Sequence, residues 1–453
     1  MFGIIILSKI VIFIGKFLNR GSNFPGNLAL KLDKNILSKF KTSAKIIAVT
    51  GSSGKGTTSK MLSSILKAQG YKVLHNYRGG NLKTGILTML LEGTNLKGQI
   101  QADYIVYEID ERYIKFVFKF LKPQILIITN LTRDQPPRQG HFDFVYEDIK
   151  SNLTCDIHLI INSDDPYLQK FLIDTDCHAT FYGIKKNKFS YKNNNYENLI
   201  MQYCPICNHK LSYKYYHFES YGNYYCSNCG FKRNKPNYYV TNINYQKQIM
   251  TVNNKYNFKI LNNILYNIYN TMAVITTLKY LNFDLNQLIK SINNVETDYK
   301  LFNKYNYNNK NIYIFYNKNE NSTSFNQTLN FIKRHKEKKT IIIGWKTISH
   351  RYKFTDISWI YDINFELLVN NNVKEFLCIG DYSYDIATRL KLAEIDEQKI
   401  KIFSSLNEIL NNILNDKNNI YAVVNPDYVI PLLKFLKGKQ KWKLLLLIYI
   451  MIY

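Results

Sequence analysis

The stretch AVTGSSGKGTTSKML, residues 48–62, is the feature that most restricts the fold of this chain. An apolar run ends in a turn rich in glycine and serine, and a helix-forming segment follows Lys55. In such a strand–turn–helix unit, the backbone N–H groups of the turn and the helix N-terminus point at one anion. The sequence therefore predicts a phosphate-binding loop within an α/β fold.

Each kind of residue in this loop suits a different part of a nucleotide. The glycines allow backbone N–H groups to face phosphate oxygens, Lys55 supplies a cation for the outer phosphates, and the hydroxyl of Thr57 or Thr58 suits Mg²⁺. The spacing departs from the general nucleotide loop, because Gly56 follows the lysine where Ser or Thr is usual. The predicted nucleotide-binding residues here are Gly51, Ser52, Ser53, Gly54, Lys55, Gly56, Thr57 and Thr58.

Strand and helix patterns alternate from Lys45 onward. The segments KIIAVT, YKVLHN, ADYIVYEID, QILIITN and CDIHLIINSDD are predicted strands, and NIYIFYN, KTIIIGW, VKEFLCIG and NIYAVVN form a second series. Alternation with helices predicts right-handed βαβ units and parallel sheets, whose ligands gather where the strands end. The predicted parts are an N-terminal apolar helix and linker at 1–44, a central domain at 45–300 and a C-terminal α/β domain at 305–453.

Two pairs of cysteines lie in a Cys- and Tyr-rich insert at residues 200–236. They follow the pattern C-x2-C…C-x2-C, with Cys204, Cys207, Cys226 and Cys229 as its members. This pattern predicts a closed tetrahedral Zn²⁺ site that folds a small module and performs no chemistry. His209 and His217 are not needed as ligands and are expected at the surface. The remaining cysteines, expected to be buried, are Cys155, Cys177 and Cys378.

Composition narrows the compartment and the partners. Seven cysteines are too few and too unevenly spaced for a secreted disulfide framework, which indicates a reducing cytosol. The formal net charge of +26 fits either an anion-binding face or a solvated basic surface.

The N-terminal segment MFGIIILSKIVIFIGKF is too short and too charged to span a bilayer, so it is predicted either to lie on a membrane surface or to pack on its own domain. The apolar C-terminal KLLLLIYIMIY is likewise too short for a span.

The pattern G-x-x-G-K-x-T-T resembles the ATP loop of the Mur ligases and the folylpolyglutamate synthetases. The likeness extends to EIDE at Glu108–Glu111 and to LYNIYNTMAV, where Asn267 and Asn270 match asparagines of the family's adenine-side helix. These enzymes use ATP to convert a carboxylate into an acyl phosphate, which an amine then attacks. The resemblance implies ATP and Mg²⁺ as cofactors, with Glu108 as a Mg²⁺ ligand and, with Lys55, a catalytic residue.

The order of motifs is similar to that of one family, MurT, the ligase-like subunit of lipid II isoglutaminyl synthases. HNYRGGNLKTGI, with Asn76, Gly80, Asn81 and Gly85, precedes EIDE, and LTRDQ, INSDDP, the four-cysteine insert and TDISW follow it. The resemblance implies that Asn81 contacts the nucleotide. It also implies ATP-dependent amidation of the D-glutamate α-carboxylate in the lipid II stem peptide, which gives D-isoglutamine.

The resemblance also implies partners. Free ammonia is scarce at neutral pH and the chain has no complete glutaminase triad, so a GatD-like glutaminase subunit is expected to supply ammonia. Asp356 of TDISW is expected to orient the partner's histidine, with Asp362 as second choice; an Asp that only caps a helix is the alternative. The expected location is the cytoplasm, peripheral at the inner face of the membrane where lipid II lies, with no nucleic-acid partner.

Several departures from the family pattern keep other functions open. PPRQGH replaces an acidic segment after residue 135, and DYKLFNKYN replaces an arginine-containing segment near residue 298. These losses leave room for reduced turnover or an altered acceptor. The alternatives are a Mur- or folylpolyglutamate-type amino-acid ligase and a catalytically weakened nucleotide-binding scaffold. A nucleic-acid-binding zinc ribbon is disfavoured, because the ribbon is embedded in a ligase-like domain.

Overall fold

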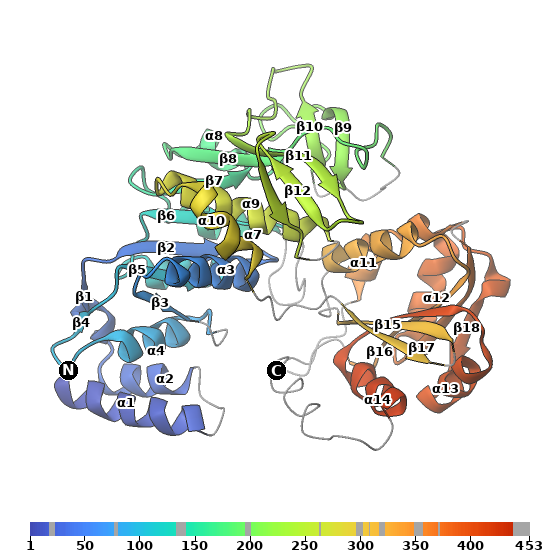
Figure 1. The fold of residues 1–453 in the computed structure, drawn as a ribbon, viewed down its shortest axis with the longest axis horizontal. Coiled ribbons are helices and arrows are strands. Elements are labelled where there is room, and N and C mark those ends of the chain that lie inside the picture. The colour runs from blue at the N-terminus through green and yellow to red at the C-terminus, as the bar shows by residue number, and fades with distance from the viewer. Residues whose placement is uncertain are drawn as a thin grey trace. The chain divides into compact units, whose positions relative to one another are not determined.

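The computed structural model divides into two compact units, whose elements Figure 1 labels in chain order. The first unit takes in the described residues up to Val295, and the second takes in those from Phe302 onward. The structure describes residues 1–17, 23–76, 80–132, 142–194, 201–261, 264–295, 302–307, 309–316, 322–347, 357–369 and 372–437.

A nine-stranded sheet forms the middle of the first unit, in the order β13-β12-β11-β8-β7-β6-β2-β5-β3. All neighbours from β3 to β11 run parallel, whereas β12 and β13 extend one edge as antiparallel strands. The bounds are β2 (Lys45–Thr50), β3 (Val73–His75), β5 (Tyr104–Glu108), β6 (Ile125–Ile128), β7 (His158–Asn162), β8 (Ala179–Ile184), β11 (Tyr238–Asn244), β12 (Ile249–Val252) and β13 (Tyr256–Lys259).

Helices pack along this sheet and bury most residues of its central strands. Five of the six residues of β2 are buried, as expected for a parallel strand covered on both faces. The prediction of an α/β fold with a parallel sheet is therefore confirmed. The helices are α3 (Lys55–Ala68), α4 (Lys83–Gly93), η2 (Glu111–Tyr113), α5 (Ile114–Val117), α7 (Phe142–Lys150), α8 (Lys170–Asp174), α9 (Leu265–Tyr280) and α10 (Leu285–Asn293).

The N-terminal helices pack on the first unit. Helix α1 (Phe2–Phe17) contacts α2 (Phe24–Leu32) and α4, with Ile5 and Ile12 buried in the contact. A short helix η1 (Ile36–Lys39) and a two-stranded sheet of β1 (Lys41–Thr42) and β4 (Gln99–Ile100) lead to β2. Among the described residues, no helix is both long and apolar enough to cross a membrane.

The second unit is a separate α/β domain around a six-stranded sheet, in the order β14-β15-β19-β16-β17-β18. Only the β14–β15 pair is antiparallel. The prediction of a C-terminal α/β domain is confirmed. Its elements are β14 (Phe302–Tyr307), β15 (Lys310–Tyr316), α11 (Ser322–Arg334), β16 (Lys339–Trp345), η3 (Ser358–Asp362), η4 (Phe365–Leu368), β17 (Val373–Gly380), α12 (Ser383–Leu392), η5 (Glu397–Lys399), β18 (Ile400–Phe403), α13 (Leu406–Asn415), β19 (Asn419–Val424) and α14 (Pro426–Lys437).

Candidate functional site

The loop between β2 and α3 requires glycine at two positions. Gly51 and Gly54 have φ angles of 122° and 88°, in the left-handed region that other residues rarely adopt. A Cβ atom on Gly54 would lie 2.5 Å from Oδ1 of Asn270, and one on Gly51 would lie 2.3 Å from Oγ1 of Thr129. The two glycines thus allow a tight turn and leave room for the side chains of Asn270 and Thr129 against the loop.

Residues after β6 hold the loop in this shape. The N–H of Ser53 donates to Oδ1 of Asn130 at 3.0 Å, and Nδ2 of Asn130 donates back to the Ser53 carbonyl at 2.9 Å. The Ser52 hydroxyl donates to the Thr132 carbonyl at 2.9 Å and accepts from the Thr132 N–H at 2.9 Å. These contacts fix the backbone of the loop, so that little rearrangement is needed to bind an anion.

Lys55 is paired with a buried carboxylate in this structure. Its Nζ lies 2.9 Å from Oε1 of Glu111 and also donates to the Gly51 carbonyl. The same Glu111 oxygen accepts from the Gly51 N–H at 3.0 Å. Burial raises the pKa of Glu111, and the charge of Lys55 opposes that rise. Glu111 therefore holds Lys55 within the loop, a role that sequence reasoning missed because EIDE was considered only for metal binding.

Glu108, at the end of β5, faces the first turn of α3. The amide of Asn76 pairs with the Glu108 backbone, accepting from its N–H at 2.9 Å and donating to its carbonyl at 2.8 Å. Asn81 donates to Oε1 of Glu108 at 3.2 Å, and a Cβ on Gly56 would lie 3.0 Å from Oε2. A carboxylate beside the helix start fits the Mg²⁺ role predicted for Glu108.

Threonine hydroxyls follow at the start of α3. Thr57 is half-buried, and the hydroxyl of the fully buried Thr58 makes no hydrogen bond within the described part of the chain. The donor chemistry of the two hydroxyls fits Mg²⁺ equally, so the choice between Thr57 and Thr58 stays a prediction. Because Gly56 has no side chain, the Glu108 carboxylate can lie close to the first turn of α3.

Helix α9 brings its asparagines to the same loop. Asn270 lies against Gly54 and donates to Oδ1 of Asn267 at 3.4 Å, and both side chains are buried. The structure therefore brings together the loop, Glu108, Asn81 and these two asparagines. All belong to the first unit, and most were predicted to bind the nucleotide or its metal.

The four cysteines of the insert converge on one point. Their sulfur atoms all lie within 4.8 Å of one another, although they come from two segments on either side of the hairpin β9 (Ser212–Phe218) and β10 (Tyr221–Tyr225). Four thiolates at this separation form a donor set for a tetrahedral ion with no open position. The residues present thus fit the predicted structural Zn²⁺.

A buried ion pair connects the cysteine insert to the sheet and to α9. Arg233, just after the second cysteine pair, places Nε 2.6 Å from Oδ1 of Asp164, and the Tyr269 hydroxyl donates to Oδ2 of Asp164 at 2.9 Å. The Ile184 N–H also donates to Oδ2, at 2.7 Å. Because Tyr269 immediately precedes Asn270, the same helix turn contacts both the insert's ion pair and the nucleotide loop. Sequence reasoning treated the basic segment around Arg233 only as a flank.

Two expectations about side chains of this region were wrong. His217 is buried and not at the surface, because its Nε2 lies 2.9 Å from the Ile184 carbonyl beside the ion pair. Cys155 is exposed and not buried, since it lies in the turn before β7.

His75, at the end of β3, gives the stability of this region a pH dependence. Burial lowers the pKa of His75 from 6.5 to about 3, and its Nε2 lies 3.2 Å from Oγ of Ser59 on α3. A histidine whose folded pKa is depressed takes up its proton only on unfolding, so stability is lost as the pH falls below about 6.5. We expect a loss of about 2 kcal/mol at pH 5, measured by denaturant unfolding. The variant His75→Gln should lose this part of the pH slope; an unchanged slope would contradict the assignment.

Other predicted residues lie elsewhere or outside the described residues. Asp356 and the PPRQGH segment fall outside them. Asp362 is the last residue of η3 in the second unit, where its carbonyl accepts from Nδ2 of Asn326 at 3.1 Å.

Comparison with known proteins gives two family matches along the chain. Residues 49–229 match the Mur ligase middle domain, and residues 319–428 match the MurT ligase C-terminal domain. The subunit MurT of lipid II isoglutaminyl synthase from Staphylococcus aureus is 28% identical over 381 residues, which cover 83% of this chain and 84% of that protein. The corresponding subunit from Streptococcus pneumoniae is 26% identical over 441 residues, with 94% and 95% covered.

Solved structures show the same fold. A pseudomurein peptide ligase type C from Methanothermus fervidus superimposes with a TM-score of 0.64 at 22% identity, covering 86% of this chain and 78% of that one. MurF from Acinetobacter baumannii gives a TM-score of 0.59 at 16% identity, with 84% and 73% covered. The fold of peptide ligases of this type is therefore shared by the chain.

Proposed function

Since the chain belongs to the MurT family of Mur-type ligases, we propose that it is the ligase subunit of a lipid II isoglutaminyl synthase. It would use ATP to amidate the D-glutamate α-carboxylate of the lipid II stem peptide. The observation that carries this proposal is the joint presence of a Mur ligase middle domain, a four-cysteine insert and a MurT C-terminal domain in one chain. An amino-acid ligase with only the Mur-type fold would not account for the four-cysteine insert or the MurT C-terminal domain.

The loop and its neighbours provide the means to activate a carboxylate. The N–H groups at the N-terminus of α3 would bind the phosphates of ATP, and Lys55 would move from Glu111 to the transferred phosphoryl group. Asn81, Asn267 and Asn270 would line the rest of the nucleotide site. The acceptor carboxylate would attack the γ-phosphorus, giving an acyl phosphate and ADP.

Magnesium and zinc would have separate roles. Glu108 and Thr57 would hold Mg²⁺, which when bound neutralises the charge that develops on the phosphates. The four cysteines would hold Zn²⁺ away from the reaction, and the ion pair of Arg233 with Asp164 connects their module to α9.

Ammonia for the second step would come from a partner. We propose a GatD-like glutaminase, to whose catalytic histidine Asp356 would be hydrogen-bonded, with Asp362 as the second choice. The location proposed is the cytoplasmic face of the membrane. A row of exposed apolar side chains on α1, including Phe2, Ile10 and Phe13, supports contact with a lipid surface.

The assay that tests this function supplies the purified chain with ATP, lipid II and one nitrogen source at a time. We expect ammonium to give ADP and a lipid II product whose α-carboxylate has become an amide, detected by mass spectrometry. Condensation with an added amino acid would instead identify an amino-acid ligase. ATP hydrolysis that does not respond to lipid II would contradict the proposal and favour a nucleotide-binding scaffold.

A further inference from the structure

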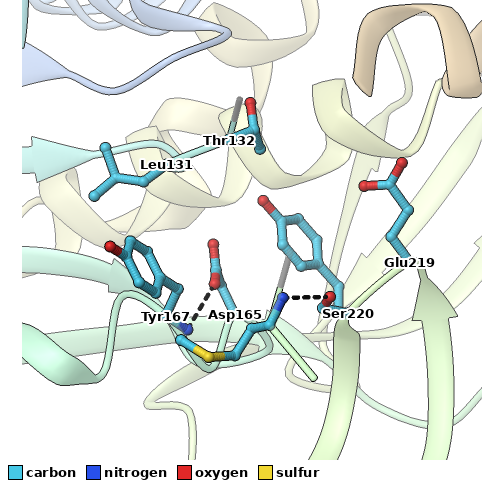
Figure 2. A pocket seen from close by; sticks show the side chains of 8 residues that line it. Leu131, Thr132, Asp165, Tyr167, Glu219 and Ser220 are labelled. Atoms are coloured by element: carbon cyan, nitrogen blue, oxygen red, sulfur yellow. Dashed lines mark hydrogen bonds between the residues drawn. The ribbon is translucent and has the colours of Figure 1, made fainter. Parts of the chain in front are cut away.

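A small pocket lies next to the loop, where β6 and β7 end (Figure 2). Its lining comes from three places in the first unit: the segment after β6 supplies Thr132, the segment after β7 supplies Asp165 and Tyr167, and the β9–β10 hairpin supplies Glu219 in its turn and Tyr221 at the start of β10. Its volume is ≈ 10 Å³, which is room for one guest the size of water or ammonium. A sugar or a peptide is too large for it.

The pocket contains buried polar atoms that lack partners. Oδ1 of Asp165 accepts from the Tyr167 N–H at 3.0 Å, whereas Oδ2 makes no hydrogen bond with any described residue. The Thr132 hydroxyl also makes none. The Tyr221 hydroxyl lies near the Asp165 carboxyl and lowers its pKa, although neither atom has a partner of good hydrogen-bond geometry. All three side chains are more than nine-tenths buried, with 3%, 3% and 5% exposed for Asp165, Thr132 and Tyr221. Buried polar atoms are nearly always hydrogen-bonded in proteins, so this set indicates a small polar guest.

The chemistry of the lining favours a cation that donates hydrogen bonds. The pocket offers the carboxylate of Asp165 and the hydroxyl oxygens of Thr132 and Tyr221. Figure 2 shows the Asp165 carboxyl group pointing from the end of β7 toward the side of the pocket formed by Leu131 and Thr132. Burial raises the pKa of Asp165 to about 7, and neighbouring Asp164 adds to the rise. A bound cation would restore the ionised form of Asp165.

One residue belongs to both the pocket and the phosphate loop. The backbone of Thr132 exchanges two hydrogen bonds with the hydroxyl of Ser52, and its side chain lines the pocket. A guest in the pocket is therefore held beside the loop at which the acyl phosphate would form. That placement suits the nucleophile of the second step.

We propose that this pocket binds ammonium and that Asp165 accepts a proton from it, so that ammonia is released beside the phosphate loop. This inference rests on the proposed amidating function and identifies the site of its nitrogen substrate. The proton passes from the ammonium nitrogen to Oδ2 of Asp165, which frees the nitrogen lone pair. Ammonia then forms the C–N bond at the acyl-phosphate carbon as the C–O bond to phosphate breaks. The leaving phosphate takes the surplus proton of the nitrogen, and Asp165 returns its own proton to solvent.

The test compares two nucleophiles in the full-length chain with ATP and lipid II. Ammonium must be deprotonated before it reacts, whereas hydroxylamine is largely unprotonated at neutral pH and gives a hydroxamate directly. We expect Asp165→Asn to raise the KM for ammonium at least about tenfold, because a charge-assisted hydrogen bond is lost. Its hydroxamate formation should stay within about twofold of the wild type. Asp176→Asn makes the same change at an exposed site and should alter neither reaction.

Each outcome decides between the alternatives. Equal losses with both nucleophiles would mean that Asp165 has a purely structural role, which would contradict the proposed ammonium site. An unchanged KM for ammonium would also contradict it. If Asp165→Asn does not fold, Thr132→Val removes one hydroxyl of the same pocket, and it should raise the KM for ammonium about threefold or more; no rise would overturn the proposal. A wild-type chain that makes neither amide nor hydroxamate would instead reject the proposed function itself.

Discussion

The variant Lys55→Met is expected to lose amide synthesis by about a thousandfold while also destabilising the first unit. The first effect follows because Lys55 would be the cation closest to the transferred phosphoryl group, and removing one preorganised donor of this kind costs about 10²–10³ in rate. The second follows because Glu111 is 1% exposed and would remain as an unpaired buried charge. Breaking a buried pair on one side costs about 3 kcal/mol or more. Steady-state kinetics and denaturant unfolding measure the two effects.

A second substitution separates the two roles of Lys55. The double variant Lys55→Met with Glu111→Gln removes both charges of this pair. Its free energy of unfolding should therefore return toward the wild-type value, while amide synthesis stays lost. In the single variant, the pKa of Glu111 should rise further, because burial and the charge of Asp110 raise it and Lys55 no longer opposes them. A carboxyl with a raised folded pKa destabilises the protein at higher pH, so the deficit should be largest at neutral pH and shrink on acidification. Lys67→Met, at the exposed far end of α3, is the matched control. Full amide synthesis by Lys55→Met would reject the phosphate-binding assignment.

Local sequence was sufficient to predict those parts of the site whose functional residues lie close together in the chain. The strand, loop and helix around residues 48–62 were predicted because the glycine turn, the lysine and the apolar periodicity lie within fifteen residues. The four-cysteine cluster was predicted because each C-x2-C pair forms its half of the site locally. In both cases, a short segment determines its own geometry.

Contacts between distant segments could not be predicted in the same way. The side chains that bind Asp164 belong to Arg233 and Tyr269, which lie 69 and 105 residues further along the chain. Which residues meet there depends on the order of strands in the sheet, and no motif encodes that order. The antiparallel strands β12 and β13 were also missed, since each has only four residues, which is too short for a clear alternating pattern. Burial of His217 followed from the same long-range packing and could not be inferred from its neighbours.

Removal of the metal from the four cysteines is expected to lower the stability of the whole first unit and to weaken nucleotide binding. Without an ion, the thiols no longer hold the two segments of the insert together, and closed zinc sites of this type supply folding free energy directly. Arg233, four residues after Cys229, would then lose its fixed position beside Asp164. An unpaired Asp164 costs about 3 kcal/mol or more. Asp164 without Arg233 would also no longer fix the Tyr269 hydroxyl, so that Asn270 is no longer held against Gly54.

Two variants and one control make this expectation specific. Cys204→Ser should reduce bound zinc, lower the unfolding temperature and raise the KM for ATP. Arg233→Met should keep the zinc content but raise the KM for ATP about tenfold, since only the ion pair behind α9 is lost. Cys155→Ser, at an exposed cysteine outside the insert, should leave all three quantities unchanged. If Arg233→Met lowers only the unfolding temperature and leaves the KM for ATP unaltered, the insert stabilises the fold without positioning α9. The metal would then have no influence on the nucleotide site beyond folding.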